Sequence, residues 1–194
     1  MIKKTILFSL MIVLFINCWG DKKTAIGTNF NDTSFVSKNF KTKIYFSDLA
    51  SPCSYISKEI LAKLYNVSVD KILTIEGNAQ NKTCTLRVKL SDEEYNYLVG
   101  SIRFYEEKDK LEDGTSWVES WQLQKGISKS AEWIPNLGNA ALWIDKKREL
   151  RVKFKNYTMA INVPGAAFNK KEKALNRDYK KIALALADKT PILK

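Results

Sequence analysis

An apolar segment near the N-terminus most constrains what this chain can fold into, because it separates a leader from the residues that can form a domain. Lys3 and Lys4 precede an apolar run from Ile6 to Ile16 that only Ser9 interrupts. As a helix this run would extend about 16 Å, roughly half of the hydrocarbon core of a bilayer, so it is too short for a permanent transmembrane helix. A basic start followed by a short apolar run is instead typical of a secretory signal peptide.

A cysteine follows the apolar run, in the sequence Leu14-Phe15-Ile16-Asn17-Cys18. This sequence resembles a bacterial lipobox, in which the cysteine thiol takes a diacylglycerol and the freed amine takes a further acyl chain. The resemblance implies a lipoprotein signal peptide over residues 1–17 and a lipid anchor on Cys18, with the domain outside the cytoplasm on a bacterial membrane. Each buried methylene contributes about 0.8 kcal/mol, so two or three chains hold a protein durably. Plain secretion and an uncleaved anchor are the alternatives.

The residues behind the leader divide into a tether and a domain. Residues 18–42 lack a clear apolar period and are rich in Thr, Asn and Ser, so we expect a lipid-anchored tether there and a single domain over residues 43–194. The formal net charge is +11, and removing Lys3 and Lys4 with the leader leaves +9. The basic residues are scattered lysines and few arginines, without the clusters of a nucleic-acid groove, so no nucleic-acid partner is predicted. A solvated surface is favoured, and attraction to anionic lipid or an acidic polymer is the alternative.

The chain has three cysteines, and export bears on their pairing. With Cys18 lipidated, Cys53 and Cys84 remain as a pair in an environment that favours disulfides. A bridge between them would close a loop of about 31 residues and contribute roughly 3 to 4 kcal/mol. The alternatives are two free buried thiols or a redox pair, although the Cys-x-x-Cys spacing of redox pairs is absent.

The pattern of apolar residues predicts helices interleaved with strands. One helix is expected from the Ser57 cap to Asn66, a second from the Ser116 capping box to Gly126, and a third from Asn169, with Glu172 answering that cap, to Asp188. Strands are expected over residues 43–46, 83–90, 95–106, 141–144, 149–154 and 158–163, with a helix as the alternative for 95–106. This order predicts an α+β fold, a single domain with a mainly antiparallel sheet and flanking helices.

Three short motifs resemble a group of small bacterial lipoproteins of unknown function. They are Pro52-Cys53-Ser54-Tyr55-Ile56-Ser57-Lys58-Glu59, Cys84 at the start of a strand, and Asn136-Leu137-Gly138-Asn139-Ala140-Ala141-Leu142-Trp143. The group has a Gly-Leu-Gly-Asp-Ala-Ala-type turn at the third motif, and some of its members are similar to the PsbP-like α/β/α sandwich. The resemblance implies such a sandwich over about residues 43–187. Asn136 and Asn139 depart from the usual turn, while Gly138 can still take a positive φ.

Nothing in the sequence predicts a catalytic residue, a metal or a cofactor. The chain has no histidine, which removes the commonest general base and metal ligand, and it lacks the nucleotide-binding glycine motifs and the calcium-binding loop. Pairs of adjacent carboxylates occur at Glu93-Glu94, Glu106-Glu107 and Glu112-Asp113. Two carboxyl groups can act together in the hydrolysis of a glycosidic bond. Such pairs in lysine-rich segments are usually solvated, so an enzyme is the least favoured class.

Three aromatic residues, Trp133, Trp143 and Tyr157, flank the Gly138 turn and the closing strands. They either line a groove for a lipid, a glycan or a protein, or fill the core. Aromatic side chains dominate the packing of small cores, which favours a place in the core. The function we expect is a noncatalytic envelope module that binds a protein or an envelope polymer. The alternative is a periplasmic inhibitor or immunity protein that blocks a toxin or an enzyme.

Overall fold

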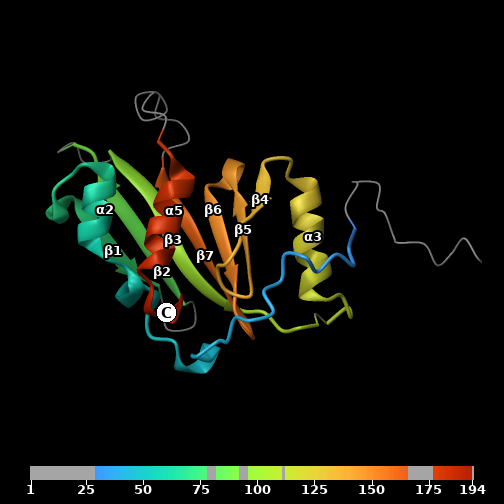
Figure 1. The fold of residues 1–194 in the computed structure, drawn as a ribbon. Coiled ribbons are helices and arrows are strands. Elements are labelled where there is room, and N and C mark those ends of the chain that lie inside the picture. The colour runs from blue at the N-terminus through green and yellow to red at the C-terminus, as the bar shows by residue number, and fades with distance from the viewer. Residues whose placement is uncertain (1–28, 78–81, 92–95, 111, 166–176, 194) are drawn as a thin grey trace, which may run out of the picture.

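The computed structural model describes residues 29–77, 82–91, 96–110, 112–165 and 177–193. They form one α+β domain built on a seven-stranded antiparallel sheet, which confirms the predicted fold class (Figure 1). The strands lie in the order β1-β2-β3-β7-β6-β5-β4. Their bounds are β1 Ile72–Glu76, β2 Thr83–Lys89, β3 Tyr97–Glu106, β4 Ala131–Trp133, β5 Ala140–Ile144, β6 Glu149–Lys153 and β7 Tyr157–Gly165. The α-helices are α2 Lys58–Tyr65, α3 Trp117–Ile127 and α5 Tyr179–Asp188, and short 3₁₀ turns include η3 Pro52–Tyr55 and η4 Val69–Lys71.

Two helices begin at the caps that the sequence predicts. The Ser57 hydroxyl accepts a hydrogen bond from the Ile60 amide at 3.2 Å at the start of α2. Ser116 and Glu119 form a reciprocal capping box at the start of α3, with distances of 2.9 and 3.1 Å. These side chains satisfy amides that the first helical turn leaves without partners.

The predicted start of the third helix is wrong. Helix α5 begins at Tyr179, and its cap is Asp178, whose carboxylate accepts a hydrogen bond from the Lys181 amide at 2.9 Å. The expected cap at Asn169 and its partner Glu172 lie outside the described residues. An Asp cap directly before an apolar period is a stronger signal than a distant Asn, because its carboxylate also interacts favourably with the helix dipole.

The strand predictions fail for three segments of the chain. Residues 43–46 form an irregular segment that enters a 3₁₀ turn and belong to no strand. The edge strands β1 and β4 were not predicted, since each is short and shows little alternation. By contrast, β3 confirms the strand that was favoured over a helix for residues 95–106.

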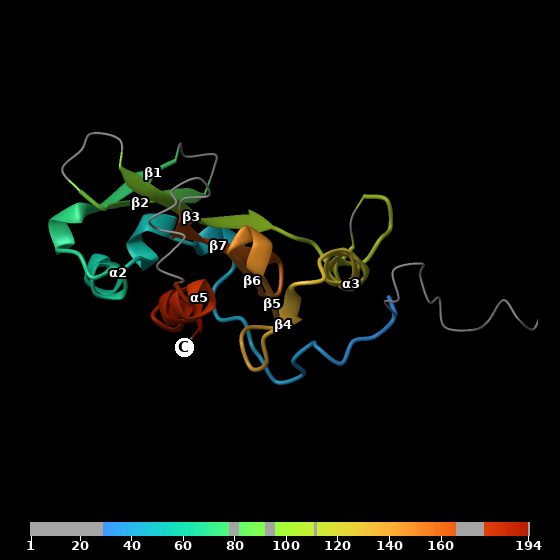
Figure 2. The ribbon, with the colours of Figure 1, turned by 90° about the horizontal axis from the view of Figure 1, so that it is seen from above.

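The first face of the sheet carries the main core, which α2 and α5 cover (Figure 2). Alternate residues of each strand point to it, as Cys84, Leu86 and Val88 do on β2, where all three are fully buried. The helices contribute Leu61, Tyr65, Ile182, Ala183 and Leu186 to the same core. This face therefore accounts for most of the apolar burial in the described residues.

Helix α3 lies on the second face and covers only the part of the sheet that contains β4 and β5. Trp117 and Trp121 pack there against Leu142 and Ile144 of β5 in a separate apolar cluster. In the view from above, α3 lies on the opposite side of the sheet from α2 and α5 (Figure 2). The second face thus has a covered half and a half that no described element covers.

Part of the segment before the domain packs on this second cluster. The Phe35 ring stacks on Trp133, with centroids 3.9 Å apart, and meets Trp117 edge-on at 6.0 Å. The Gln122 amide donates a hydrogen bond to the Asp32 carbonyl at 2.7 Å. Residues 29–42 fall within the range predicted as tether, and residues 18–28 of that range lie outside the described residues.

The turn before β5 depends on the glycine that the sequence singles out. Gly138 has a φ of +64°, and a Cβ there would lie 2.7 Å from the Lys153 carbonyl oxygen. Gly114 also has a positive φ, +82°, but its Cβ would meet nothing within 4 Å. We expect Gly138→Ala to lower the free energy of unfolding by about 3 kcal/mol and Gly114→Ala by about 1 kcal/mol, because only the first adds steric overlap to the conformational cost. Urea denaturation measures both, and equal losses would contradict this reasoning.

Candidate functional site

The uncovered half of the second sheet face is the strongest candidate for a binding site. We call it the open face and define it by the side chains of β1, β2 and β3 that alternate away from the main core. Its residues are Leu73, Ile75, Thr83, Thr85, Arg87, Lys89, Tyr97, Val99, Ser101 and Arg103. Strand register fixes this set, because directly paired residues of antiparallel strands point to the same side.

Apolar side chains lie on both sides of the middle strand of the open face, Leu73 and Ile75 on the edge strand β1 and Val99 on β3. Leu73 is 39 % exposed, Ile75 is 44 % exposed and Val99 is 49 % exposed. Leu73 pairs with Arg87, which pairs with Val99 in turn, so one row of side chains crosses three strands. Aliphatic residues grouped on an exposed strand face, with no helix over them, are typical of a surface that contacts another molecule.

The charged residues of the open face all have the same sign. Arg87, Lys89 and Arg103 are cations, and none of the ten residues is Asp or Glu. The Arg87 guanidinium carbon lies 5.7 Å from the ring centroid of Tyr97, and that of Arg103 lies 5.4 Å from that of Tyr105. Such contacts contribute about 0.5 to 1 kcal/mol each at exposed sites and hold the guanidinium groups on the face.

Tyr105 marks the border between the open face and the covered half. Burial raises the pKa of its hydroxyl to about 12, so the ring stays neutral at physiological pH and adds no negative charge beside Arg103. Towards α3 the charges of the second face are paired instead. Arg151 contacts Glu149 at 2.5 Å and also donates to Gln124 of α3, while Asn162 donates to Glu149 at 3.2 Å. Arg151 and Glu149 are therefore paired within the covered half.

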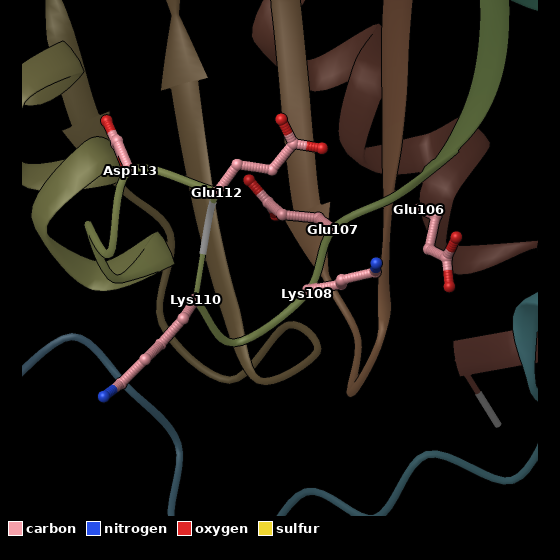
Figure 3. Close-up of a pocket in the computed structure, with 6 residues that line it drawn as sticks. All are labelled: Glu106, Glu107, Lys108, Lys110, Glu112 and Asp113. Carbon is pink, nitrogen blue, oxygen red and sulfur yellow. The ribbon is translucent and has the colours of Figure 1, made fainter.

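The loop between β3 and α3 forms an open cavity of about 660 Å³. Its lining consists of Glu106, Glu107, Lys108, Lys110, Glu112 and Asp113, which brings together two of the adjacent carboxylate pairs noted in the sequence (Figure 3). Lys110 and Asp113 extend away from the Glu107 carboxylate in this view. The third pair, Glu93-Glu94, lies outside the described residues.

Two of the carboxylates of this cavity, those of Glu107 and Asp113, have structural partners. Glu107 accepts hydrogen bonds from the Trp121 indole at 3.1 Å and from the Thr158 hydroxyl. The Thr115 amide lowers the pKa of Asp113, which is the opposite of what a general acid requires. Among the described residues, no three His, Cys, Asp or Glu side chains are placed to hold a metal ion. The cavity thus offers charge on an open loop, and the carboxylates of Glu107 and Asp113 serve the local structure.

The three aromatic residues for which a groove was the alternative to a place in the core do not lie together. Trp143 and Tyr157 are buried in the main core on the first face, where Tyr157 stacks on Phe154 at 4.6 Å. Trp133 lies on the second face and, with Phe35, lines a smaller cavity of about 370 Å³. Trp133 and Trp143 point to opposite faces because each follows the alternation of its own strand.

The cysteines form the disulfide that the sequence favours. Cys53 in η3 is bonded to Cys84 on β2, with Cα atoms 5.0 Å apart. The bridge attaches η3 to the first face of the sheet, and Cys84 is fully buried there. Cys18 lies outside the described residues. Within the part of the chain that the structure describes, no helix has both the length and the apolar composition that a membrane span requires.

Comparisons of the chain with protein families, with curated proteins and with solved structures found no match. The site therefore rests on the geometry of this chain alone.

Sequence reasoning missed the open face as a site. Within the strand predicted over residues 83–90, Thr85, Arg87 and Lys89 alternate with Leu86 and Val88, and the structure buries only Leu86 and Val88 of these five. The apolar members were missed because Leu73 and Ile75 belong to a strand that was not predicted. The available signal was the aliphatic and β-branched composition of residues 72–75.

Proposed function

We propose that this chain is a membrane-anchored bacterial lipoprotein of the cell envelope and acts as a noncatalytic binding module. Lipid on Cys18 holds it to the membrane, and the open face binds the partner. The observation that carries the binding role is the grouping of three exposed aliphatic residues with three cations on one uncovered sheet face.

The assignment to the envelope draws support from the cysteines. A disulfide between Cys53 and Cys84 suits an oxidising compartment outside the cytoplasm. It also leaves Cys18 as the one cysteine of the three outside the bridge, directly after the apolar leader. The absence of histidine from the whole chain supports a noncatalytic role, because the commonest general base is missing.

The anchor is tested by replacing Cys18→Ser in the full chain. We expect the wild-type protein to incorporate labelled palmitate and to stay with membranes through a salt wash, and the variant to lose both properties. The double variant Cys53→Ala/Cys84→Ala is the matched control, since it removes two cysteines and should still take the label. A Cys18→Ser protein that remains on washed membranes would show that the apolar segment itself is the anchor.

A further inference from the structure

The C-terminal end of α3 carries the most exposed large apolar side chain of the described residues. Ile127, the last residue of the helix, is 66 % exposed, and Leu123, one turn earlier, is 42 % exposed. Residues four apart lie on the same side of a helix, so the two form one aliphatic flank. Neither belongs to the cluster through which Trp117 and Trp121 pack on the sheet. Their apolar surface is therefore available to contact another molecule.

Lysines gather around this end of α3. The chain passes from α3 through residues 128–130 into β4, and Ala131 of β4 pairs with Ile144, the last residue of β5. The turn after α3 and the 3₁₀ turn η5 Asp145–Lys147 therefore lie at the same end of the sheet (Figure 1). We call this part of the surface the basic corner, and it consists of Leu123, Lys125, Ile127, Lys129, Lys146 and Lys147.

The basic corner has few carboxylates that could neutralise its lysines. Residues 125–132 and 145–149 contain five cations and three acids. Two of these acids, Glu132 and Glu149, form ion pairs with cations outside the two ranges. None of the ion pairs within the described residues includes a lysine of the basic corner. This end of the domain therefore presents net positive charge around two exposed aliphatic side chains.

The first described residues lie beside α3. The Gln122 side-chain amide donates to the Asp32 carbonyl at 2.7 Å, and the Asp32 amide donates to the Asn29 carbonyl at 3.2 Å. Cys18 precedes Asn29 by 11 residues, which can span at most about 40 Å. Strand β1, at the other edge of the sheet, lies six strand spacings, about 29 Å, from β4. A lipid on Cys18 would therefore draw the edge that carries α3, and not the open face, towards the membrane.

We propose that the basic corner contacts the anionic lipid surface of the membrane that holds Cys18. Ile127 inserts among the lipid headgroups, and the four lysines lie against their phosphates. An acidic polysaccharide would supply the anions but no apolar phase for Ile127 and Leu123. This contact rests on the proposed function, because so small a patch binds a bilayer only weakly until an anchor raises its effective concentration at the surface.

The test measures where a spin label on the basic corner lies relative to a bilayer. Ile127→Cys in the full lipidated chain is labelled with a nitroxide and reconstituted into vesicles of phosphatidylethanolamine and phosphatidylglycerol. Tyr45→Cys is the matched control, because Tyr45 is 54 % exposed and precedes Phe46, which contacts Tyr157 at the opposite end of the sheet. We expect the ratio of oxygen to nickel-chelate collisions to be at least about threefold higher at position 127, since oxygen concentrates in the bilayer.

Labelling and retention distinguish failure of this contact from failure of the proposed function. Cys53 and Cys84 are bonded to each other, so the wild-type chain should take no label when Cys18 carries lipid. A wild-type chain that takes the label, or that washes off the vesicles in salt, overturns the anchor and this contact together. A retained chain whose position 127 is as accessible to the nickel chelate as position 45 overturns this contact alone. Deeper immersion of position 45 than of position 127 overturns it as well.

Reversing the lysines tests the role of charge. Added to Ile127→Cys, Lys125→Glu/Lys129→Glu should return the collision ratio to within about twofold of that at position 45, while the chain stays on the vesicles. The matched control Lys41→Glu/Lys155→Glu reverses two exposed lysines near the turn between β6 and β7, at the opposite end, and should leave the ratio unchanged. Unaltered lysines on vesicles of phosphatidylcholine alone should behave as Lys125→Glu/Lys129→Glu does. A label that stays immersed in both conditions overturns the contact of the lysines with anionic lipid.

Discussion

Replacing Lys153→Met is expected to lower the free energy of unfolding by about 3 kcal/mol, although the change conserves most of the side-chain volume. Lys153 is fully buried, and its ammonium donates to the carbonyl oxygens of Glu107, Phe154 and Lys155 at 3.0, 2.8 and 3.0 Å. It also lies 5.3 Å from the ring centroid of Trp117. Methionine removes all three donors and leaves the carbonyls short of partners inside the protein.

Denaturant titration of the Lys153→Met protein measures this loss, with Lys155→Met as the matched control. Lys155 is exposed and contributes to the network only through its backbone, so its replacement should change stability by less than about 0.5 kcal/mol. Equal stability of the two variants would show that the buried ammonium is dispensable.

The contribution of Lys153 to the free energy of unfolding depends on pH, and the direction of this dependence follows from its pKa. Burial lowers the pKa of Lys153 below 10.5, and the nearby Glu107 and Asp109 oppose that shift. The folded state therefore releases this proton at a lower pH than the unfolded chain does. The stability of the wild-type protein relative to Lys153→Met should consequently increase as the pH rises towards 10.5. A difference that decreases over this range would contradict the assignment.

Removing the disulfide by Cys53→Ala/Cys84→Ala is expected to cost about 3.5 kcal/mol. The bridge joins residues 31 apart in the sequence, and opening that loop restores conformational freedom to the unfolded chain. In the folded state it attaches η3 to β2, and Ser51, at the cap of η3, also hydrogen-bonds Glu76 of β1 at 2.7 Å. The loss should therefore lie mainly in global stability, while the sheet itself still forms.

A reductant provides the control for this second prediction. Denaturation of the wild-type protein in dithiothreitol should approach the midpoint of the double variant, and the variant should not respond to the reductant. A wild-type midpoint that is unchanged after verified reduction would contradict a stabilising bridge.

The sequence predicted local features well and long-range ones poorly, for physical reasons. The caps at Ser57 and Ser116 depend on residues only three apart, and the alternation of β2 depends on one strand, so both could be read directly. The position of β1 beside β2 depends on pairing across the intervening loop, which no local pattern specifies. The start of α5 was missed because Asn169 suggested an earlier cap than Asp178.

For the candidate site, too, the local features could be predicted from the sequence and the long-range ones could not. The polar side of β2 was predictable, but the open face required the sheet order and the knowledge that α3 covers only the β4 and β5 region. The alternative of a groove formed by Trp133, Trp143 and Tyr157 relied on closeness in sequence, whereas strand alternation sends Trp133 and Trp143 to opposite faces. Nothing in the sequence indicated that Lys153 is buried, because lysines are common in this chain and are usually exposed.

The most direct test of a binding role for the open face is hydroxyl-radical footprinting of the full chain in its own membranes and after purification. We predict that oxidation of Leu73, Ile75 and Val99 falls severalfold in the membranes, while oxidation of exposed Tyr45 and Val69 stays the same. Equal oxidation of the three open-face residues in both states would show that nothing covers this face in the envelope, and would contradict the proposed function.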